Sequence, residues 1–543
     1  MSIKTRTASG AAASARRVKR CVTYRTRSCA RHATARPAIN GTRGKCHFFS
    51  PRKHLRPART LNSLHSKNRT LLGASQLLIA VCCTRPMGEA DVSGAAAVLV
   101  LAVSRVVPTP APAEREGRVK LSFFDTPWVV LPPIQRVFLY ELPGADEFPA
   151  VAKRLKESLA ATLAQYLPLA GKLTYVAETG DVFVDCADDP GVAFVEAEGD
   201  MDVRRLAGDE AHDLPAFLAL VPELDVKVLP APVLSVQATQ LRDGLALGLS
   251  VHHAVADGQA VWRFMRAWAS ASREGSPVTK TLGPPHYSRD AIHVPGGDEF
   301  AREMLKVVAP NLPVANAMNY DFGHRFRLAR RTFYLAADDI RSLKRRIDAL
   351  ASAENAGGSE TASSWKPVST FVALSALGWT AFVLSKGLAA GDDTYLVFLA
   401  DLRERLDPPV GDGYLGNCIK GCMATADAGE LLGERGLLRA ARAIQAAVAE
   451  MEAAPLAGTD RWMERMMKLP FARVANVAAS PRFRVYEAAD LGFGRPARVE
   501  LVSMNHDGEM VLVGGRRNGE VQLSVSLDPA RMDAFKAHVL AID

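Results

Sequence analysis

The chain has 543 residues and a formal charge of +9, but this charge is divided unevenly along the sequence. Residues 1–86 hold 19 of the 67 Lys and Arg residues and no Asp or Glu, so the remainder has a formal charge of −10. An acidic body argues against nucleic-acid binding, and its few cysteines indicate a reducing compartment without a disulfide framework. No apolar run is long enough to span a bilayer, and no repeat, phosphate loop or metal-ligand spacing of cysteines occurs.

The basic extension, residues 1–94, is expected to be disordered. Its composition fits three alternatives: an organellar transit peptide, a nucleic-acid-binding arm, or an artefact of gene prediction with translation starting at Met87. Plastid or mitochondrial targeting follows only if the extension is translated, and otherwise we expect a cytoplasmic protein.

Regular elements are predicted from the end of this extension onward. The periodicity of apolar residues predicts, in order, a strand over 97–107, a helix over 146–167, and short strands over 172–177, 182–186 and 192–196.

Residues 245–268 have the sharpest pattern in the chain. Apolar residues alternate from Leu245 to Val251, which is typical of a half-buried strand, and the turn at Asp243-Gly244 predicts a hairpin. Helical spacing resumes at Ala260, so His253 and Asp257 should lie on a tight turn between a strand and a helix. A neutral imidazole there could accept a proton from a hydroxyl or amine, while Asp257 could pair with an arginine or cap the helix. A polar turn with a merely solvated histidine fits the same residues.

The rest of the chain is predicted to form a second half. Residues 274–330 show little periodicity and are interpreted as a crossover between two domains, 95–273 and 331–543. Strands are predicted over 332–335, 394–399, 498–503, 510–514 and 521–527, the last three as a meander. Helices are predicted over 338–350, 368–384, 430–452, 459–469 (capped by Thr459 or Asp460) and 528–540, and a surface loop over 351–364.

Five segments, in a fixed order, resemble the BAHD acyl-CoA-dependent acyltransferases of plants. The segment HHAVADG at 252–258 resembles the HxxxDG signature of that family. The others are LSFFDTPWVVLPPIQRVFLY at 121–140, PLAGKL at 168–173, GYLGNC at 413–418, and DLGFG at 490–494, which resembles DFGWG. The resemblance covers about residues 95–543, and its start favours Met87 as the true beginning of the protein.

This resemblance implies an α/β fold with two chloramphenicol acetyltransferase-like domains, each a mixed sheet with flanking helices. An active-site channel would lie between them. His253 would remove a proton from an acceptor hydroxyl, which would attack the thioester of acyl-CoA without a covalent enzyme intermediate. Asp257 would not touch the substrate but would pair with Arg403 of the other domain.

The resemblance also implies roles for further residues. Asp490, Gly492 and Gly494 would support the site structurally. Residues expected to bind substrate or CoA are Gly258, Ser369, Thr370, Ser480 and Phe493. Ser369 and Thr370 begin a predicted helix whose N-terminus suits CoA phosphates, and Ser480 would lie near the oxyanion. No metal and no tightly bound cofactor are expected, and acyl-CoA is the expected co-substrate.

The GYLGNC segment and the sequence around DLGFG resemble anthocyanin and phenolic-glucoside malonyltransferases. They imply a malonyl donor and a sugar hydroxyl of a glycosylated phenolic or flavonoid as acceptor. The alternatives are hydroxycinnamoyl transfer within the same family, a condensation-domain-like enzyme, and a binding protein without activity. We expect a monomer that binds neither nucleic acid nor membranes.

Overall fold

A computed structural model describes residues 98–542, except 112–116, 143–146, 280, 316–321 and 357–364. The basic extension of residues 1–94 and the predicted loop from residue 357 to 364 lie outside the described residues. None of the helices in the described ranges is both long and apolar enough to cross a lipid bilayer.

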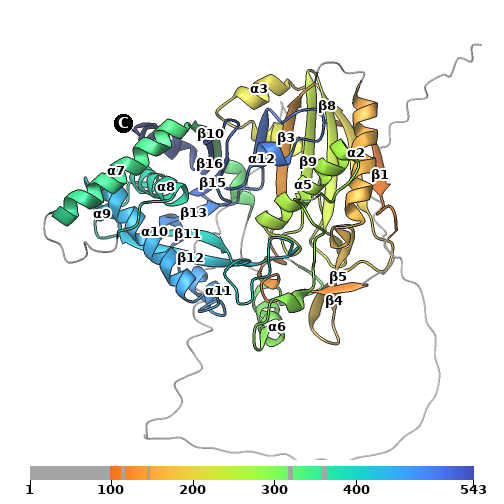
Figure 1. The fold of residues 1–543 in the computed structure, drawn as a ribbon, viewed down its shortest axis with the longest axis horizontal. Coiled ribbons are helices and arrows are strands. Elements are labelled where there is room, and N and C mark those ends of the chain that lie inside the picture. Colours follow the sequence, from red (N-terminus) through yellow and green to blue (C-terminus); the bar gives the residue numbers. More distant parts are fainter. Residues whose placement is uncertain are drawn as a thin grey trace, which may run out of the picture. The chain divides into compact units, whose positions relative to one another are not determined.

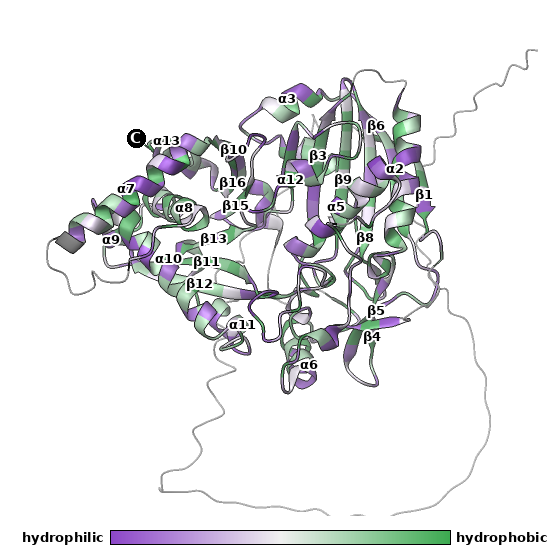
Figure 2. Ribbon diagram, in the orientation of Figure 1, coloured by the Kyte–Doolittle hydropathy of each residue, from purple (hydrophilic) through white to green (hydrophobic). Residues whose placement is uncertain are grey.

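The first half of the chain builds a mixed six-stranded sheet. Its order is β1 (Val98–Val106), β6 (Val192–Gly199), β8 (Leu234–Leu241), β9 (Gly244–Val251), β3 (Ile134–Glu141) and β14 (Arg498–Leu501). Only β6 and β8 run parallel; the other neighbours are antiparallel. The strands in the middle of this sheet are largely hydrophobic (Figure 2), because both of their faces are covered.

Helices cover both faces of this sheet. On one face, α2 (Phe148–Leu163) and α5 (Gly258–Glu274) pack against each other and share a core with β3, β8 and β9 (Figure 1). On the other face, α3 (Val203–Gly208) and α4 (Leu214–Ala219) enclose a smaller core.

The second half builds another mixed six-stranded sheet. Its order is β10 (Ala329–Leu335), β16 (Val521–Leu527), β15 (Glu509–Gly514), β13 (Val474–Ala478), β11 (Asp393–Asp401) and β12 (Ile419–Asp427). The helices with it are α7 (Ala337–Ala356), α8 (Thr370–Lys386), α9 (Ala428–Leu432), α10 (Gly436–Ala453), α11 (Trp462–Met467) and α13 (Met532–Leu540). Helix α8 is buried on nearly all sides, which explains its almost unbroken apolar sequence.

Smaller elements complete the described part of the chain. A four-stranded sheet has the order β2 (Arg118–Lys120), β5 (Asp181–Asp185), β4 (Lys172–Val176) and β7 (Ala231–Pro232). Two helices remain, α6 (Gly297–Val308) and α12 (Val485–Ala488).

The structure corrects several local predictions. The strand predicted over 498–503 does not belong to the terminal meander, because β14 pairs with β3 in the first sheet. Alternation of apolar residues predicts a strand but not its partner. Residues 351–356 continue helix α7 instead of forming a loop, and the helix predicted over 430–452 is divided into α9 and α10 at Gly433.

Other corrections concern short elements and one cap. Helix α11 begins after Arg461 without a side-chain cap, so neither Thr459 nor Asp460 caps it. The prediction missed α3, α4, α6, α12, β2, β7, β12 and β13. Helix α6 lies inside residues 274–330, and its buried residues Ala301, Leu305 and Val308 recur at helical spacing, so this segment is not without periodicity as predicted.

Candidate active site

A strand, a turn and a helix position His253 and Asp257. Strands β8 and β9 pair as the predicted hairpin, β9 ends at Val251, and α5 begins at Gly258. Asp257 is the N-cap of α5: its Oδ1 accepts a hydrogen bond of 2.9 Å from the amide of Ala260. The turn is therefore fixed to the helix by its own last residue.

A buried ion pair connects this turn to the second half of the chain. Arg403 follows β11, and its Nη1 and Nη2 donate to Oδ2 and Oδ1 of Asp257 at 2.9 and 3.0 Å. Both side chains are almost fully buried. Burial disfavours a charged guanidinium, but the carboxylate of Asp257 outweighs this and raises the pKa of Arg403 above its ordinary value. Arg403 therefore stays charged and contacts Asp257 through both of its terminal nitrogens.

The GYLGNC segment surrounds the same ion pair. The carbonyls of Tyr414 and Gly416 accept hydrogen bonds from Arg403, and the amide of Cys418 donates to Asp257 at 3.0 Å. Each polar group of the pair thus has several partners, which is what a buried charge requires.

Asn417 links this segment to the histidine turn. Its Nδ2 donates to the carbonyl of His253 and to Oδ1 of Asp125, both at 2.9 Å. Asp125 is fully buried and is held in turn by Nε of Arg289 at 2.9 Å and by Ser122. Asp125, Asn417 and Arg289 belong to the hydrogen-bond network around His253, and the sequence reasoning did not single them out. The only signal for two of them was their position in the LSFFD and GYLGNC segments.

The imidazole of His253 is the accessible titrating group of the site. It is half-buried and stacks on the indole of Trp128, with ring centroids 4.2 Å apart and planes 11° from parallel. Among the described residues, its Nδ1 has no hydrogen-bond partner. Burial lowers the pKa of His253 below its ordinary value, so the ring is neutral near pH 7 and can accept a proton.

The neighbouring His252 is different in kind. It is fully buried, its Nδ1 accepts a hydrogen bond of 3.2 Å from the amide of Ala254, and burial lowers its pKa to about 3. His252 is therefore a neutral core residue that does not reach solvent.

The segment containing Ser480 lies against the start of α5. A Cβ on Gly258 would be 3.3 Å from the ring of Phe483, so glycine allows the close approach. Strand β13 ends at Ala478, and Ala479 adopts a left-handed φ of 68° before Ser480. The Oγ of Ser480 accepts a hydrogen bond from the amide of Arg482.

The DLGFG segment contacts the opposite end of α5. Arg273 donates to the carbonyl of Asp490, and Ser272 donates to the carbonyl of Leu491 at 2.6 Å. Gly492 and Gly494 have φ values of 92° and 98°, which side chains rarely adopt. Fifteen residues of helix, about 22 Å, separate Gly258 from this contact, so the segment does not reach His253.

Three further predicted site residues also lie outside the histidine cluster. Phe493 packs edge-on against Tyr140 and lies under the guanidinium of Arg154. Ser369 caps α8 by accepting a hydrogen bond of 3.2 Å from the amide of Val372, with Thr370 as the first helical residue.

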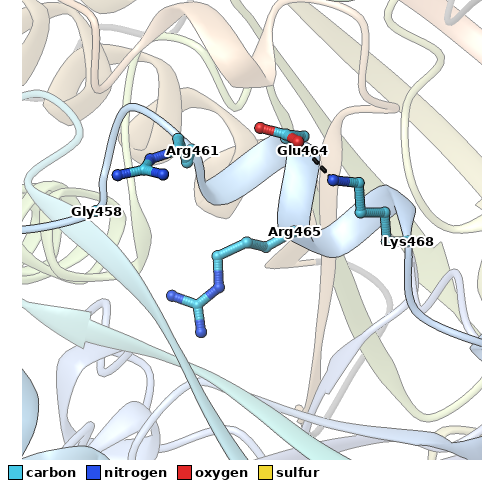
Figure 3. A pocket seen from close by; sticks show the side chains of 5 residues that line it. All are labelled: Gly458, Arg461, Glu464, Arg465 and Lys468. Carbon is cyan, nitrogen blue, oxygen red and sulfur yellow. Dashed lines mark hydrogen bonds and ion pairs between the residues drawn. The ribbon is translucent and has the colours of Figure 1, made fainter. Parts of the chain in front are cut away.

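A surface pocket on the second half contains none of these residues. It has a volume of about 360 Å³ and lies around α11 (Figure 3). Its lining is Gly458, Arg461, Glu464, Arg465 and Lys468, with Glu464 and Lys468 paired at 2.5 Å. The candidate site therefore rests on the hydrogen-bond geometry around His253.

Sequence comparisons relate this geometry to known proteins. The Transferase family matches residues 99–541. Phenolic glucoside malonyltransferase 2 of Arabidopsis thaliana is 30% identical over 453 residues, covering 80% of this chain and 97% of that relative. Malonyl-CoA:anthocyanidin 5-O-glucoside-6''-O-malonyltransferase of the same plant is 30% identical over 455 residues, covering 81% and 97%.

Solved structures share the fold. Vinorine synthase superposes with a TM-score of 0.61 at 19% identity, covering 82% of this chain and 98% of that one. F. sporotrichioides TRI101, crystallised with coenzyme A and T-2, gives a TM-score of 0.57 at 18% identity, covering 77% and 97%. The predicted fold, two mixed-sheet halves with flanking helices, is confirmed. The chain belongs to the Transferase family and is a BAHD acyltransferase whose co-substrate is acyl-CoA.

Proposed function

We propose that this enzyme transfers a malonyl group from malonyl-CoA to a sugar hydroxyl of a glycosylated phenolic or flavonoid. The relatives at 30% identity are malonyltransferases of phenolic and anthocyanidin glucosides, and they support this donor and acceptor class. The observation that carries the chemistry is the half-buried, neutral His253, whose turn is fixed by the ion pair of Asp257 with Arg403 and by Asn417.

The proposed reaction is a direct transfer. His253 accepts the proton of the acceptor hydroxyl while that oxygen attacks the thioester carbonyl. The tetrahedral intermediate collapses, the carbon–sulfur bond breaks, and the CoA thiolate leaves and receives the proton from His253. A general base of this kind typically accelerates a reaction about 100- to 10,000-fold.

Other residues have supporting roles in this proposal. Asp257 and Arg403 orient His253, and the DLGFG segment with Asp490, Gly492 and Gly494 supports the far end of α5. Ser480 would lie near the oxyanion, Gly258 would contact the thioester, and Phe493 would contact a more distant part of the substrate or CoA. Ser369 and Thr370 at the N-terminus of α8 would bind a CoA phosphate. Acyl-CoA and acceptor would enter a channel between the two halves.

We further propose that the enzyme is a cytoplasmic monomer.

Hydroxycinnamoyl transfer is the alternative within the family. The test incubates the purified chain with malonyl-CoA and 4-coumaroyl-CoA in one tube, together with a panel of phenolic glucosides. Mass spectrometry identifies the product, and free CoA thiol is measured in parallel. A malonylated glucoside supports the proposal, a coumaroylated one supports the alternative, and no acceptor-dependent thiol release would exclude both.

A further inference from the structure

A buried arginine next to the site forms no side-chain hydrogen bond with any residue that the structure describes. Arg136 lies on β3 and is 6% exposed, yet no hydrogen bond or ion pair reaches its side chain from the described residues. Its guanidinium carbon lies 4.8 Å from the ring centroid of the Trp262 indole. An unpaired buried charge is costly, so its retention points to an anion that is present only during function.

The register of the sheet places Arg136 close to the histidine turn. Arg136 pairs with Leu249 and Ile134 pairs with Val251, the last residue of β9. A rise of about 3.4 Å per residue puts Arg136 about 7 Å from the strand end at which that turn begins. A long arginine side chain covers such a distance.

The side chain of Arg136 lies on the same face of the sheet as α5. Residues 136, 138 and 140 alternate onto one face, and Phe138 packs edge-on against Trp262 of α5. Trp262 is four residues after Gly258, about 6 Å along the helix. Arg136 and Trp262 thus come from the two elements that flank His253.

The charge of Glu500 acts on Arg136, but Glu500 does not pair with it. Glu500 on β14 pairs with Val137, so its side chain lies on the opposite face of the sheet. There it already accepts hydrogen bonds from Thr332, Ser524 and Arg498. Burial lowers the pKa of Arg136 to about 10, and Glu500 offsets this only in part.

Trp262 contributes a second unused donor. Its Nε1 and the Nε of Arg136 are both buried without an acceptor among the described residues. Each of these N–H groups can donate a hydrogen bond to a carboxylate.

We infer that Arg136, assisted by Trp262, binds the terminal carboxylate of a dicarboxylic acyl donor and thereby selects malonyl-CoA over uncharged acyl-CoAs. This inference rests on the proposed function and names the residue that determines its donor. Arg136 would be a specificity residue and would take no part in proton transfer.

The test compares donors that differ only in the carboxylate. The full chain and its Arg136→Met variant are assayed with malonyl-CoA and acetyl-CoA, with 4-nitrophenyl glucoside as acceptor and thiol release plus mass detection as readouts. In Arg136→Met we expect the ratio of kcat/KM for malonyl-CoA to that for acetyl-CoA to fall on the order of 100-fold. The reason is that the buried carboxylate of the malonyl group loses its guanidinium partner. Acetyl transfer should stay within about threefold, which also shows that the variant folds.

Two further variants keep the inference testable if Arg136→Met does not fold. Arg136→Lys retains the positive charge but not the two-pronged guanidinium group that can bind a carboxylate through two hydrogen bonds. The malonyl-to-acetyl ratio of kcat/KM should therefore fall less than in Arg136→Met, by about tenfold. Trp262→Phe retains an aromatic ring but lacks the indole N–H donor. It should lower the malonyl-to-acetyl ratio of kcat/KM by a smaller factor than Arg136→Met does. An unchanged ratio, or an equal loss with both donors, would overturn the role of Arg136 while leaving malonyl transfer intact. A wild-type chain that transfers other acyl groups but no malonyl would instead overturn the proposed donor.

Discussion

Removing Arg403 should destabilise the protein and misplace the turn that carries His253. The carboxylate of Asp257 is fully buried and accepts four hydrogen bonds, two from Arg403 and one each from the amides of Ala260 and Cys418. In Arg403→Met the two amides remain but the opposite charge is lost. Breaking a buried pair costs about 3–5 kcal/mol, and the remaining amides favour the lower end, about 3 kcal/mol.

A double-mutant cycle isolates the ion pair. Asp257→Asn keeps the shape of the side chain and leaves the guanidinium with Asp401 and the carbonyls of Tyr414 and Gly416, so we expect a loss of about 2 kcal/mol. The double variant buries no unpaired charge at this position. The decrease in the free energy of unfolding of the double variant should be smaller than the sum of the two single decreases by about 1 kcal/mol or more.

Urea denaturation measures these stabilities, and acceptor-dependent thiol release measures activity. Arg405→Met is a matched control, because Arg405 lies two residues away on the surface. This substitution should lower the free energy of unfolding by at most about 1 kcal/mol. Additive single losses, or a cost of Arg403→Met equal to that of the control, would refute the coupling. Full activity of Asp257→Asn would refute the role of the pair in orienting His253.

Three other predictions follow from named features. His252 and His212 are buried, with pKa values lowered to about 3 and about 4, so the unfolded chain binds more protons than the folded protein below pH 6.5. Lowering the pH from 7 to 5 should therefore reduce the free energy of unfolding by about 2 kcal/mol for each histidine. A urea midpoint that is equal at pH 5 and pH 7 would contradict this. Ala479→Gly relieves a left-handed φ and should raise the free energy of unfolding by up to about 1 kcal/mol, whereas a lower melting temperature would argue against strain there. Deleting residues 1–86 should leave kcat/KM unchanged, because the family match begins at residue 99, and loss of soluble, active enzyme would disprove this.

The fold and the core of the site were accessible from the sequence for different reasons. Period-2 and helical spacing located β9 and α5, although β9 is buried on both faces and is not the half-buried strand that its alternation predicted. The ordered motifs then identified the family, which no single motif could do. The strand at 498–503 received the wrong partner, because alternation carries no information about which sheet a strand joins.

The missed site residues are those whose function depends on tertiary contacts. Asp125 and Asn417 meet although 292 residues separate them, and nothing in either local pattern marks them as partners. Arg289 lies in an aperiodic segment and is recognised only through its contact with Asp125. Nothing in the sequence around Arg136 distinguishes it from an exposed charged residue on a strand. It is recognised only because the structure buries its side chain without a hydrogen-bond partner among the described residues.

The most direct test concerns the imidazole itself. Acceptor-dependent thiol release should be measured for the wild type, His253→Ala and His252→Ala, with melting temperatures as the control for folding. His253→Ala should lose about 100- to 10,000-fold in kcat while keeping its melting temperature, and the acidic limb of wild-type kcat/KM should have its midpoint below pH 6.5. His252→Ala should act mainly on stability. Near-wild-type turnover by a folded His253→Ala enzyme would contradict the proposed mechanism.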